Sequence, residues 1–142
     1  MEFPSVTSQD LQQLFVPQKD SHKGQNGKLL VIGGSELFHA ASLWALTVAS
    51  RIVDLVHYSS IPGNNEIVAK AKQEFRNGIV VARQDVESYI EEDDCILIGS
   101  GMTRDDETKE LTDRLLAKYP NKQWVIDAGA IQMMDVSLIP PH

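Results

Sequence analysis

The sequence has little of several features that define particular protein classes. It holds one cysteine, Cys95, so it can form neither a disulfide within the chain nor a cysteine-based metal cage. Its apolar runs are all shorter than the roughly 20 residues that span a bilayer, and its first residues lack the basic and apolar regions of a secretion signal. We therefore expect a cytoplasmic protein with no membrane span and no disulfide scaffold.

Positive charge is also scarce. Thirteen lysines and arginines face twenty aspartates and glutamates, which gives a net charge of -7, and no basic cluster is denser than Lys70 and Lys72. This balance argues against a nucleic-acid partner. It also opposes an anionic ligand at long range, so any phosphate must be held by local backbone N–H groups and a few placed cations.

Candidate catalytic and metal-binding residues are few as well. The histidines show no paired spacing, so we expect no metal cluster. No Ser-His-Asp order or nucleophile elbow is visible, and Cys95 lies inside an apolar run, where a thiol is usually buried and inert. We therefore assign no catalytic residue, and we interpret His57 as structural.

What is present is an alternation of short apolar runs and helical segments over one domain of 142 residues. Most of the runs are continuous, which is typical of strands covered on both faces, and right-handed crossovers would make them neighbours in one parallel sheet. We therefore predict an α/β fold. The predicted strands are 29–32, 55–58, 79–82, 95–98 and 124–126.

Helices are expected between these strands. The apolar segment 40–53 predicts a largely buried helix, with Ser35 available as a cap. A short amphipathic helix carrying Leu11, Leu14 and Phe15 is expected to pack on the outside of the sheet. No covering helix follows the last predicted strand, so we expect an exposed sheet edge there. The other predicted helices are 66–75, 85–92 and 105–118.

Glycine-rich loops follow two of the predicted strands. The sequence Gly-Gly-Ser at 33–35 follows the first strand, and Gly-Ser-Gly at 99–101 follows the fourth. Open parallel sheets bind ligands at this carboxyl edge, where backbone without side chains lets a ligand approach closely. Neither loop is a Walker loop or the dinucleotide fingerprint, and a tight turn without a ligand explains each loop alone. Two such loops at one edge favour a phosphate-bearing, nucleotide-like ligand.

A carboxylate lies at the same predicted edge. Asp127 directly follows the strand 124–126. There it could bind a ribose hydroxyl, a metal or a substrate amide, or it could cap the turn that begins near Ala130. The spacing alone leaves both interpretations open.

Taken together, these motifs stand in a known order. The order is Ser-His-Lys-Gly at 21–24, glycine at 27, Gly-Gly-Ser at 33–35, Gly-Ser-Gly at 99–101, Asp-Ala-Gly-Ala at 127–130 and Pro-Pro-His at 140–142. It resembles the NAD(P)H-hydrate dehydratase family, the YjeF carboxyl-terminal or carbohydrate-kinase domain of the ribokinase-like superfamily. The resemblance implies a three-layer α/β/α fold with a mostly parallel sheet, of which residues 1–142 would form the amino-terminal part.

The resemblance also implies a repair reaction. Members of this family use ADP or ATP to remove water from the hydrated nicotinamide ring of damaged NADH or NADPH, and Mg²⁺ could accompany the nucleotide. Some positions are thereby expected to contact the hydrated dinucleotide, and others to shape or support the loops. The expected contacts are Ala41, Gly99, Gly101 and His142, and the supporting positions are His22, Lys23, Gly24, Gly33, Gly34, Ser35 and Asp127.

The chain departs from the family pattern at several places. The glycine expected before Ala41 is Ala40, the second aspartate of Asp-Ala-Asp-Ala is Gly129, and the threonine of Thr-Pro-His is Pro140. Residues 51–54 stand where a glycine-rich turn is usual. The family also continues into a second half, which carries most adenine-nucleotide contacts and a catalytic aspartate and has no counterpart in this sequence.

Three functions are compatible with this pattern. The first is the amino-terminal half of an ADP- or ATP-dependent NAD(P)H-hydrate dehydratase, inactive alone or active once a carboxyl-terminal half completes it. The second is a degenerate, non-catalytic module that binds a nucleotide or another subunit. The third is a small-molecule kinase of the wider superfamily. We favour the first, with a nucleotide as substrate and a complementing half or a homo-oligomer as partner.

Overall fold

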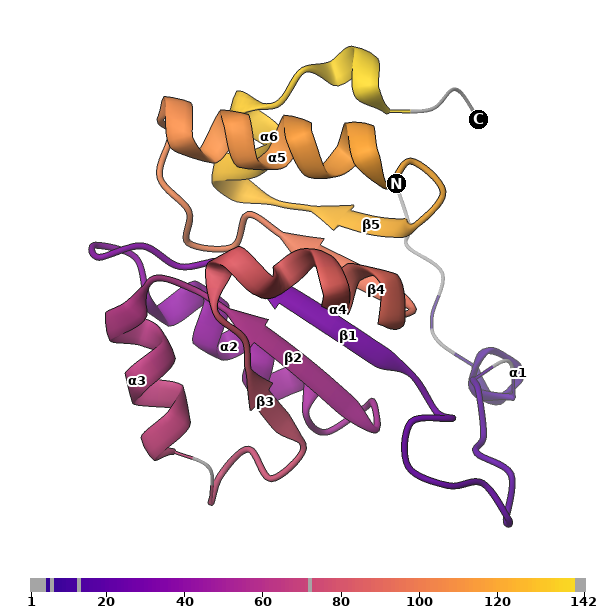
Figure 1. Ribbon diagram of the computed structural model, residues 1–142. Helices are drawn as coiled ribbons and strands as arrows, with labels where there is room; N and C mark the ends of the chain where they lie inside the picture. The colour runs from indigo at the N-terminus through magenta and orange to yellow at the C-terminus, as the bar shows by residue number, and fades with distance from the viewer. Residues whose placement is uncertain (1–4, 6, 13, 72, 140–142) are drawn as a thin grey trace.

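A five-stranded sheet forms the centre of the computed structural model, which describes residues 5, 7–12, 14–71 and 73–139 (Figure 1). All strand pairs are parallel, and the strand order is β3-β2-β1-β4-β5. The α/β prediction is confirmed, and every predicted strand is present. The strands are β1 (Lys28–Ile32), β2 (Leu55–Ser59), β3 (Gly78–Val80), β4 (Cys95–Ile98) and β5 (Gln123–Ile126).

Helices cover both faces of the sheet and give three layers. One face is covered by α4 (Val86–Glu92), α5 (Asp106–Lys118) and α6 (Ala128–Met133), and the other by α2 (Ala40–Ala49) and α3 (Pro62–Lys70). Figure 1 shows α4 in front of the sheet and α2 behind it. The remaining short elements are α1 (Ser8–Leu11), the 3-10 turn η1 (Arg83–Asp85) and the 3-10 turn η2 (Val136–Leu138).

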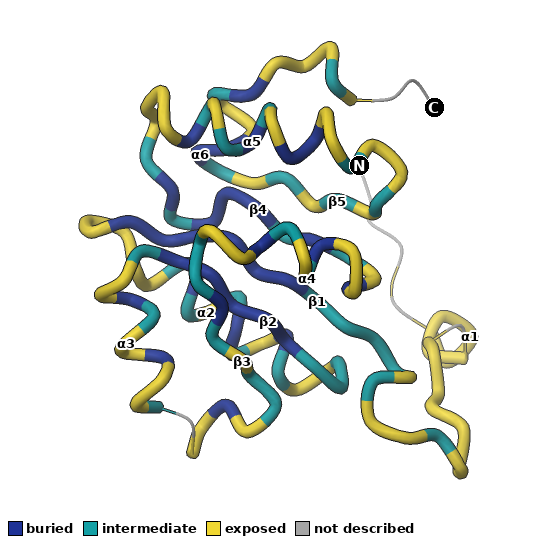
Figure 2. The backbone as a smooth tube through the Cα atoms, in the orientation of Figure 1, coloured by how far each residue is buried: buried dark blue, intermediate teal, exposed yellow. Residues whose placement is uncertain are grey.

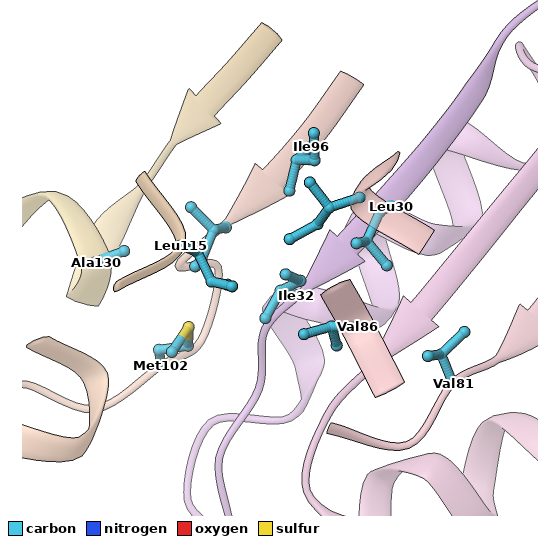
Figure 3. Packing of buried hydrophobic residues seen from close by; sticks show 10 residues of the cluster. Leu30, Ile32, Val81, Val86, Ile96, Met102, Leu115 and Ala130 are labelled. Carbon is cyan, nitrogen blue, oxygen red and sulfur yellow. The ribbon is translucent and has the colours of Figure 1, made fainter. Parts of the chain in front are cut away.

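Apolar side chains fill the space between the layers. On the first face, Leu30 and Ile32 pack with Ile96, and Figure 3 shows these side chains gathered with others from α4 and α5. On the second face, Val31 and Val56 pack against α2 and α3. Because β1 is central and covered on both faces, its apolar run is continuous rather than alternating.

Two residues predicted to be inert lie in the sheet. The Nδ1 atom of His57 on β2 is 2.9 and 2.8 Å from the two carboxylate oxygens of Asp93, and both side chains are buried. The His57 ring also lies 4.5 Å from the Tyr89 ring, so the structural interpretation of this histidine is borne out. Cys95 is half-buried rather than buried, and burial raises the pKa of its thiol, which keeps it protonated.

The bounds and burial of α2 differ from the prediction. The helix ends at Ala49 instead of residue 53, and it is not largely buried, because Trp44 is 71% exposed and Val48 is 58% exposed. Its sequence is apolar on every side, so the pattern could not indicate which side contacts the sheet. Ser35 does not cap this helix, whose N-cap is His39.

The third helix begins earlier than its pattern predicted. α3 starts at Pro62 instead of residue 66, because proline fits the first helical position. Asn64 and Asn65 therefore lie inside the helix instead of preceding it. The helix ends at Lys70, ahead of the predicted Phe75, and Phe75 is buried against the sheet beyond it.

The prediction that an amphipathic helix near the amino terminus packs on the outside of the sheet is wrong. α1 has only four residues and buries none of them, and Leu11, Leu14 and Phe15 are all exposed. Figure 2 shows this segment exposed, at a distance from the sheet. Thr7 and Asp10 stabilise the turn locally through a capping box, and so short a helix presents too little apolar surface to dock.

One part of the sheet is covered on a single face. β5 is an edge strand of the described sheet, as predicted. Leu97 of β4 and Val125 of β5 are register partners and share the face on which α2 lies, yet Val125 is 52% exposed. Gln123 and Val125 are the exposed residues of β5, so this strand presents one apolar side chain on that face.

Candidate functional site

The loops predicted to share the carboxyl edge of the sheet do meet there. The Gly34 N–H donates to the carbonyl oxygen of Ser100 at 2.8 Å, which joins the loops after β1 and β4. The Ser100 hydroxyl donates in turn to a carboxylate oxygen of Asp127 at 2.9 Å, which joins the loop after β5. Asp127 is the N-cap residue of α6 but makes no side-chain capping bond. Its carboxylate therefore tethers a neighbouring loop, a contact that neither of the two interpretations from spacing contained.

Close backbone contacts explain two of the glycines. A Cβ atom on Gly99 would overlap the carbonyl oxygen of Asp127, and one on Gly101 would overlap the carbonyl oxygen of Phe38. Both glycines also have positive φ, at 116° and 76°, which L side chains rarely adopt. The loop after β4 is therefore fixed in place by its neighbours.

A cavity of about 580 Å³ opens at this edge. It brings together Ala41 and Gly101, two positions at which the family resemblance implies dinucleotide contacts. A volume of several hundred cubic ångströms suits a small-molecule site. Its described lining residues are Phe38, Ala41, Gly101, Met102, Thr103, Arg104 and Ala128.

The other two expected dinucleotide contacts are not among the described lining residues of the cavity. Gly99 precedes Gly101 in the same loop but does not line the cavity. His142 lies outside the described residues. Ala128 lines the cavity with φ of 40°, a left-handed conformation that is costly for a residue other than glycine and is concentrated at functional sites.

Buried polar side chains support the loop after β1. The Ser35 hydroxyl accepts a hydrogen bond from the Phe38 N–H at 3.0 Å, so it shapes the turn that leads to α2. Behind it, Asn64 donates to the Ser35 carbonyl oxygen at 3.3 Å and to the Ser60 hydroxyl at 3.0 Å. These contacts hold Ser35 in place, and they were not visible in sequence spacing.

Arg83 is a further supporting residue that the sequence reasoning missed. It enters from η1, and its Nη2 donates to the Gly33 carbonyl oxygen at 3.4 Å. Its Nη1 is buried without a hydrogen-bond partner among the described residues, and burial lowers the pKa of the guanidinium. It lines a small hollow of about 50 Å³ that also touches Gly34 and Asp105. A lone arginine in a loop carries no sequence signal for such a position.

The loop containing His22, Lys23 and Gly24 is at the opposite edge of the sheet. It leads into the start of β1, whereas the cavity lies beyond the strand ends. One carboxylate oxygen of Asp54 accepts from the backbone N–H groups of Gly24, at 2.9 Å, and of Asn26, at 3.1 Å. These bonds lower the pKa of Asp54, with the Asn26 backbone as the largest cause. The aspartate that departs from the family pattern is thus a clamp for this loop.

Gly129, which stands where the family pattern has an aspartate, also has a local structural reason. A Cβ atom on Gly129 would overlap the carbonyl oxygen of Met102, because α6 approaches the loop after β4 closely. The aspartate that the family pattern predicts at this position would need that loop to move. Among the described residues, no three His, Cys, Asp or Glu side chains gather as a metal site would require.

Solved structures identify the fold class. The chain superimposes on a ribokinase-like superfamily protein from Enterococcus faecalis with a TM-score of 0.71 and 22% identity, over 83% of this chain and 42% of that one. A protein from Streptococcus mutans gives a TM-score of 0.67 at 23% identity, over 82% of this chain and 43% of that one. The fold is therefore ribokinase-like. No described helix is long and apolar enough to cross a membrane.

Sequence comparison identifies the family. The profile of the NAD(P)H-hydrate dehydratase family matches residues 29–139, so the chain belongs to that family. The bifunctional NAD(P)H-hydrate repair enzyme Nnr of Methanocaldococcus jannaschii is 37% identical over 134 residues, which cover 89% of this chain and 26% of that protein. The ADP-dependent (S)-NAD(P)H-hydrate dehydratase of Cenarchaeum symbiosum is 43% identical over 60 residues, which cover 40% of this chain and 21% of that protein. The chain thus spans about a quarter of the length of the first of these relatives.

Proposed function

We propose that the chain is the dinucleotide-binding part of an enzyme that dehydrates hydrated NADH or NADPH with the help of ADP or ATP, and that 1–142 forms a partial domain. The cavity that joins Ala41 to Gly101 carries this proposal. Its position at the carboxyl ends of parallel strands is where open α/β sheets bind ligands. The family membership supplies the reaction class.

The residues of the cavity support binding rather than bond breaking. Phe38, Ala41 and Met102 offer a mostly apolar wall that suits a nicotinamide ring and displaces water from it. The tethered loop after β4 holds this wall in one geometry, so the substrate meets a preorganised surface. We assign no catalytic residue here, since the resemblance implies that the aspartate and most adenine-nucleotide contacts come from a carboxyl-terminal half.

The incomplete covering of the sheet supports such a partner. Parallel sheets are almost always covered on both faces, but Val125 lies on a bare face and β5 has an open edge. The outward side of α2 exposes two further apolar side chains, Trp44 and Val48. A segment that pairs with β5 and packs a helix beside α2 would cover all three side chains.

The proposal is tested by turnover of hydrated NADH with ADP or ATP. The chain is assayed alone and with a separately expressed carboxyl-terminal half of a complete relative. We expect turnover only in the mixture, because the two halves supply different parts of one site. Turnover by the chain alone would contradict the need for a second half.

A non-catalytic role is the second candidate. The exposed Trp44 and Val125, together with glycine in place of aspartate at 129, favour a module that binds another subunit without performing chemistry. In the same assay, this role predicts a folded complex between the chain and the added half that shows no turnover with either nucleotide.

A further inference from the structure

The cavity contains one charged side chain that neither the family pattern nor the loop motifs single out. Of the described residues that line it, Arg104 alone carries a charge. It lies two residues before α5 and is exposed. No ion pair involves it in the part of the chain that the structure describes.

The neighbouring carboxylate is already engaged elsewhere. Asp105, which follows Arg104 directly, accepts a hydrogen bond from the Thr108 N–H at 2.8 Å and another from the Thr103 hydroxyl. These bonds lower the pKa of Asp105, with Thr103 as the largest cause, and fix it as the N-cap of α5. Asp105 is thus engaged by its own loop and helix, and the exposed Arg104 lines the cavity without an ion pair among the described residues.

The backbone on both sides of Arg104 is fixed. Gly101 packs against the Phe38 carbonyl group on one side, and the capped start of α5 anchors the other. Met102, between them, is buried in the core. The backbone that carries Arg104 therefore needs no reordering when its side chain binds an anion, which lowers the cost of binding.

We propose that Arg104 binds a phosphate group of the dinucleotide substrate and orients it in the cavity beside Ala41 and Gly101. This inference rests on the proposed function. A dinucleotide carries a negatively charged pyrophosphate between its two nucleosides, and a guanidinium binds phosphate oxygens through charge-assisted, bidentate hydrogen bonds. The net charge of -7 opposes an anionic substrate at long range, so a cation at the site is needed to bind its phosphate groups.

The test is equilibrium binding of hydrated NADH to the full 142-residue chain and two variants. Arg104→Ala should weaken binding about tenfold, as expected for the loss of a charge-assisted contact. Arg104→Lys should recover part of that loss, because it keeps the charge. Arg76→Ala is the matched control, since Arg76 is also exposed but precedes β3 at the other edge of the sheet. Added salt should weaken binding more for the unchanged chain than for Arg104→Ala.

Other outcomes would overturn the inference. Equal affinities for the unchanged chain and Arg104→Ala would remove Arg104 from the site, and so would absence of binding by the unchanged chain. A parallel titration with ADP distinguishes the two sources of phosphate: a loss confined to ADP would assign Arg104 to the adenine nucleotide and contradict the proposal. The turnover assay with an added carboxyl-terminal half is independent of these results, so the proposed function can stand or fail separately.

Discussion

The buried pair of His57 and Asp93 gives the sharpest prediction for stability. Their side chains are 3% and 0% exposed, and the Nδ1 atom of His57 contacts both carboxylate oxygens. Removing one partner leaves the other buried without compensation, which typically costs roughly 3–5 kcal/mol. For Asp93→Ala we therefore expect the free energy of unfolding to fall by about 3 kcal/mol or more, and the thermal midpoint to fall by roughly 10 °C.

The assay is denaturant unfolding of the unchanged chain, His57→Leu, Asp93→Ala and the double variant. The double variant should lose less stability than the two single losses combined, by about 1 kcal/mol or more, because the two residues act as a unit. Glu66→Ala is the control, since its ion pair with Lys70 is exposed and worth less than about 1 kcal/mol. The reasoning would be refuted if His57→Leu and Asp93→Ala each lost no more stability than Glu66→Ala and if the loss in the double variant were their sum.

Three further predictions concern the loops and the bare face. Gly101→Ala should cost roughly 1–3 kcal/mol in unfolding free energy, because its φ is 76°, and should weaken binding of hydrated NADH; unchanged values for both would contradict the geometry. Asp54 has a lowered pKa, so its contribution is present above the ordinary value of 3.8 and is lost as pH falls through the lower folded value. The difference in thermal midpoint between the unchanged chain and Asp54→Asn should therefore shrink on acidification, and a constant difference would argue against the clamp. In a Trp124→Phe background, Trp44 fluorescence should shift to the blue when a carboxyl-terminal half is added, and an unchanged spectrum would leave that side of α2 uncovered.

The fold was largely predictable because its strands are short apolar runs of the kind that a doubly covered parallel sheet requires. The position of β1 in the centre makes residues 30–32 uniformly buried, and that uniformity is visible in the sequence. The orientation of α2 was not predictable, since Trp44 and Leu46 are equally apolar and only the tertiary packing distinguishes them.

The site was predictable where topology alone determines it. Loops that follow parallel strands share one edge, so Gly34, Ser100 and Asp127 could be expected together. The role of Arg83 could not be predicted, because only packing brings η1 beside the loop after β1. Arg104 follows Gly101 in the loop after β4, but the loop motif does not indicate that its side chain lines the cavity. The Asp54 clamp was hidden for the same reason: its partners lie 28 and 30 residues away in sequence.

The central claim is that the cavity beside Ala41 and Gly101 serves dehydration of a nicotinamide dinucleotide. The most direct measurement is the rate at which hydrated NADH regains the absorbance of NADH, with ADP or ATP, in a mixture of this chain and a carboxyl-terminal half. We expect turnover in the mixture, loss of turnover on omission of either half, and a reduced rate for Gly101→Ala. A mixture that associates and binds hydrated NADH but gives no turnover with either nucleotide would contradict the claim.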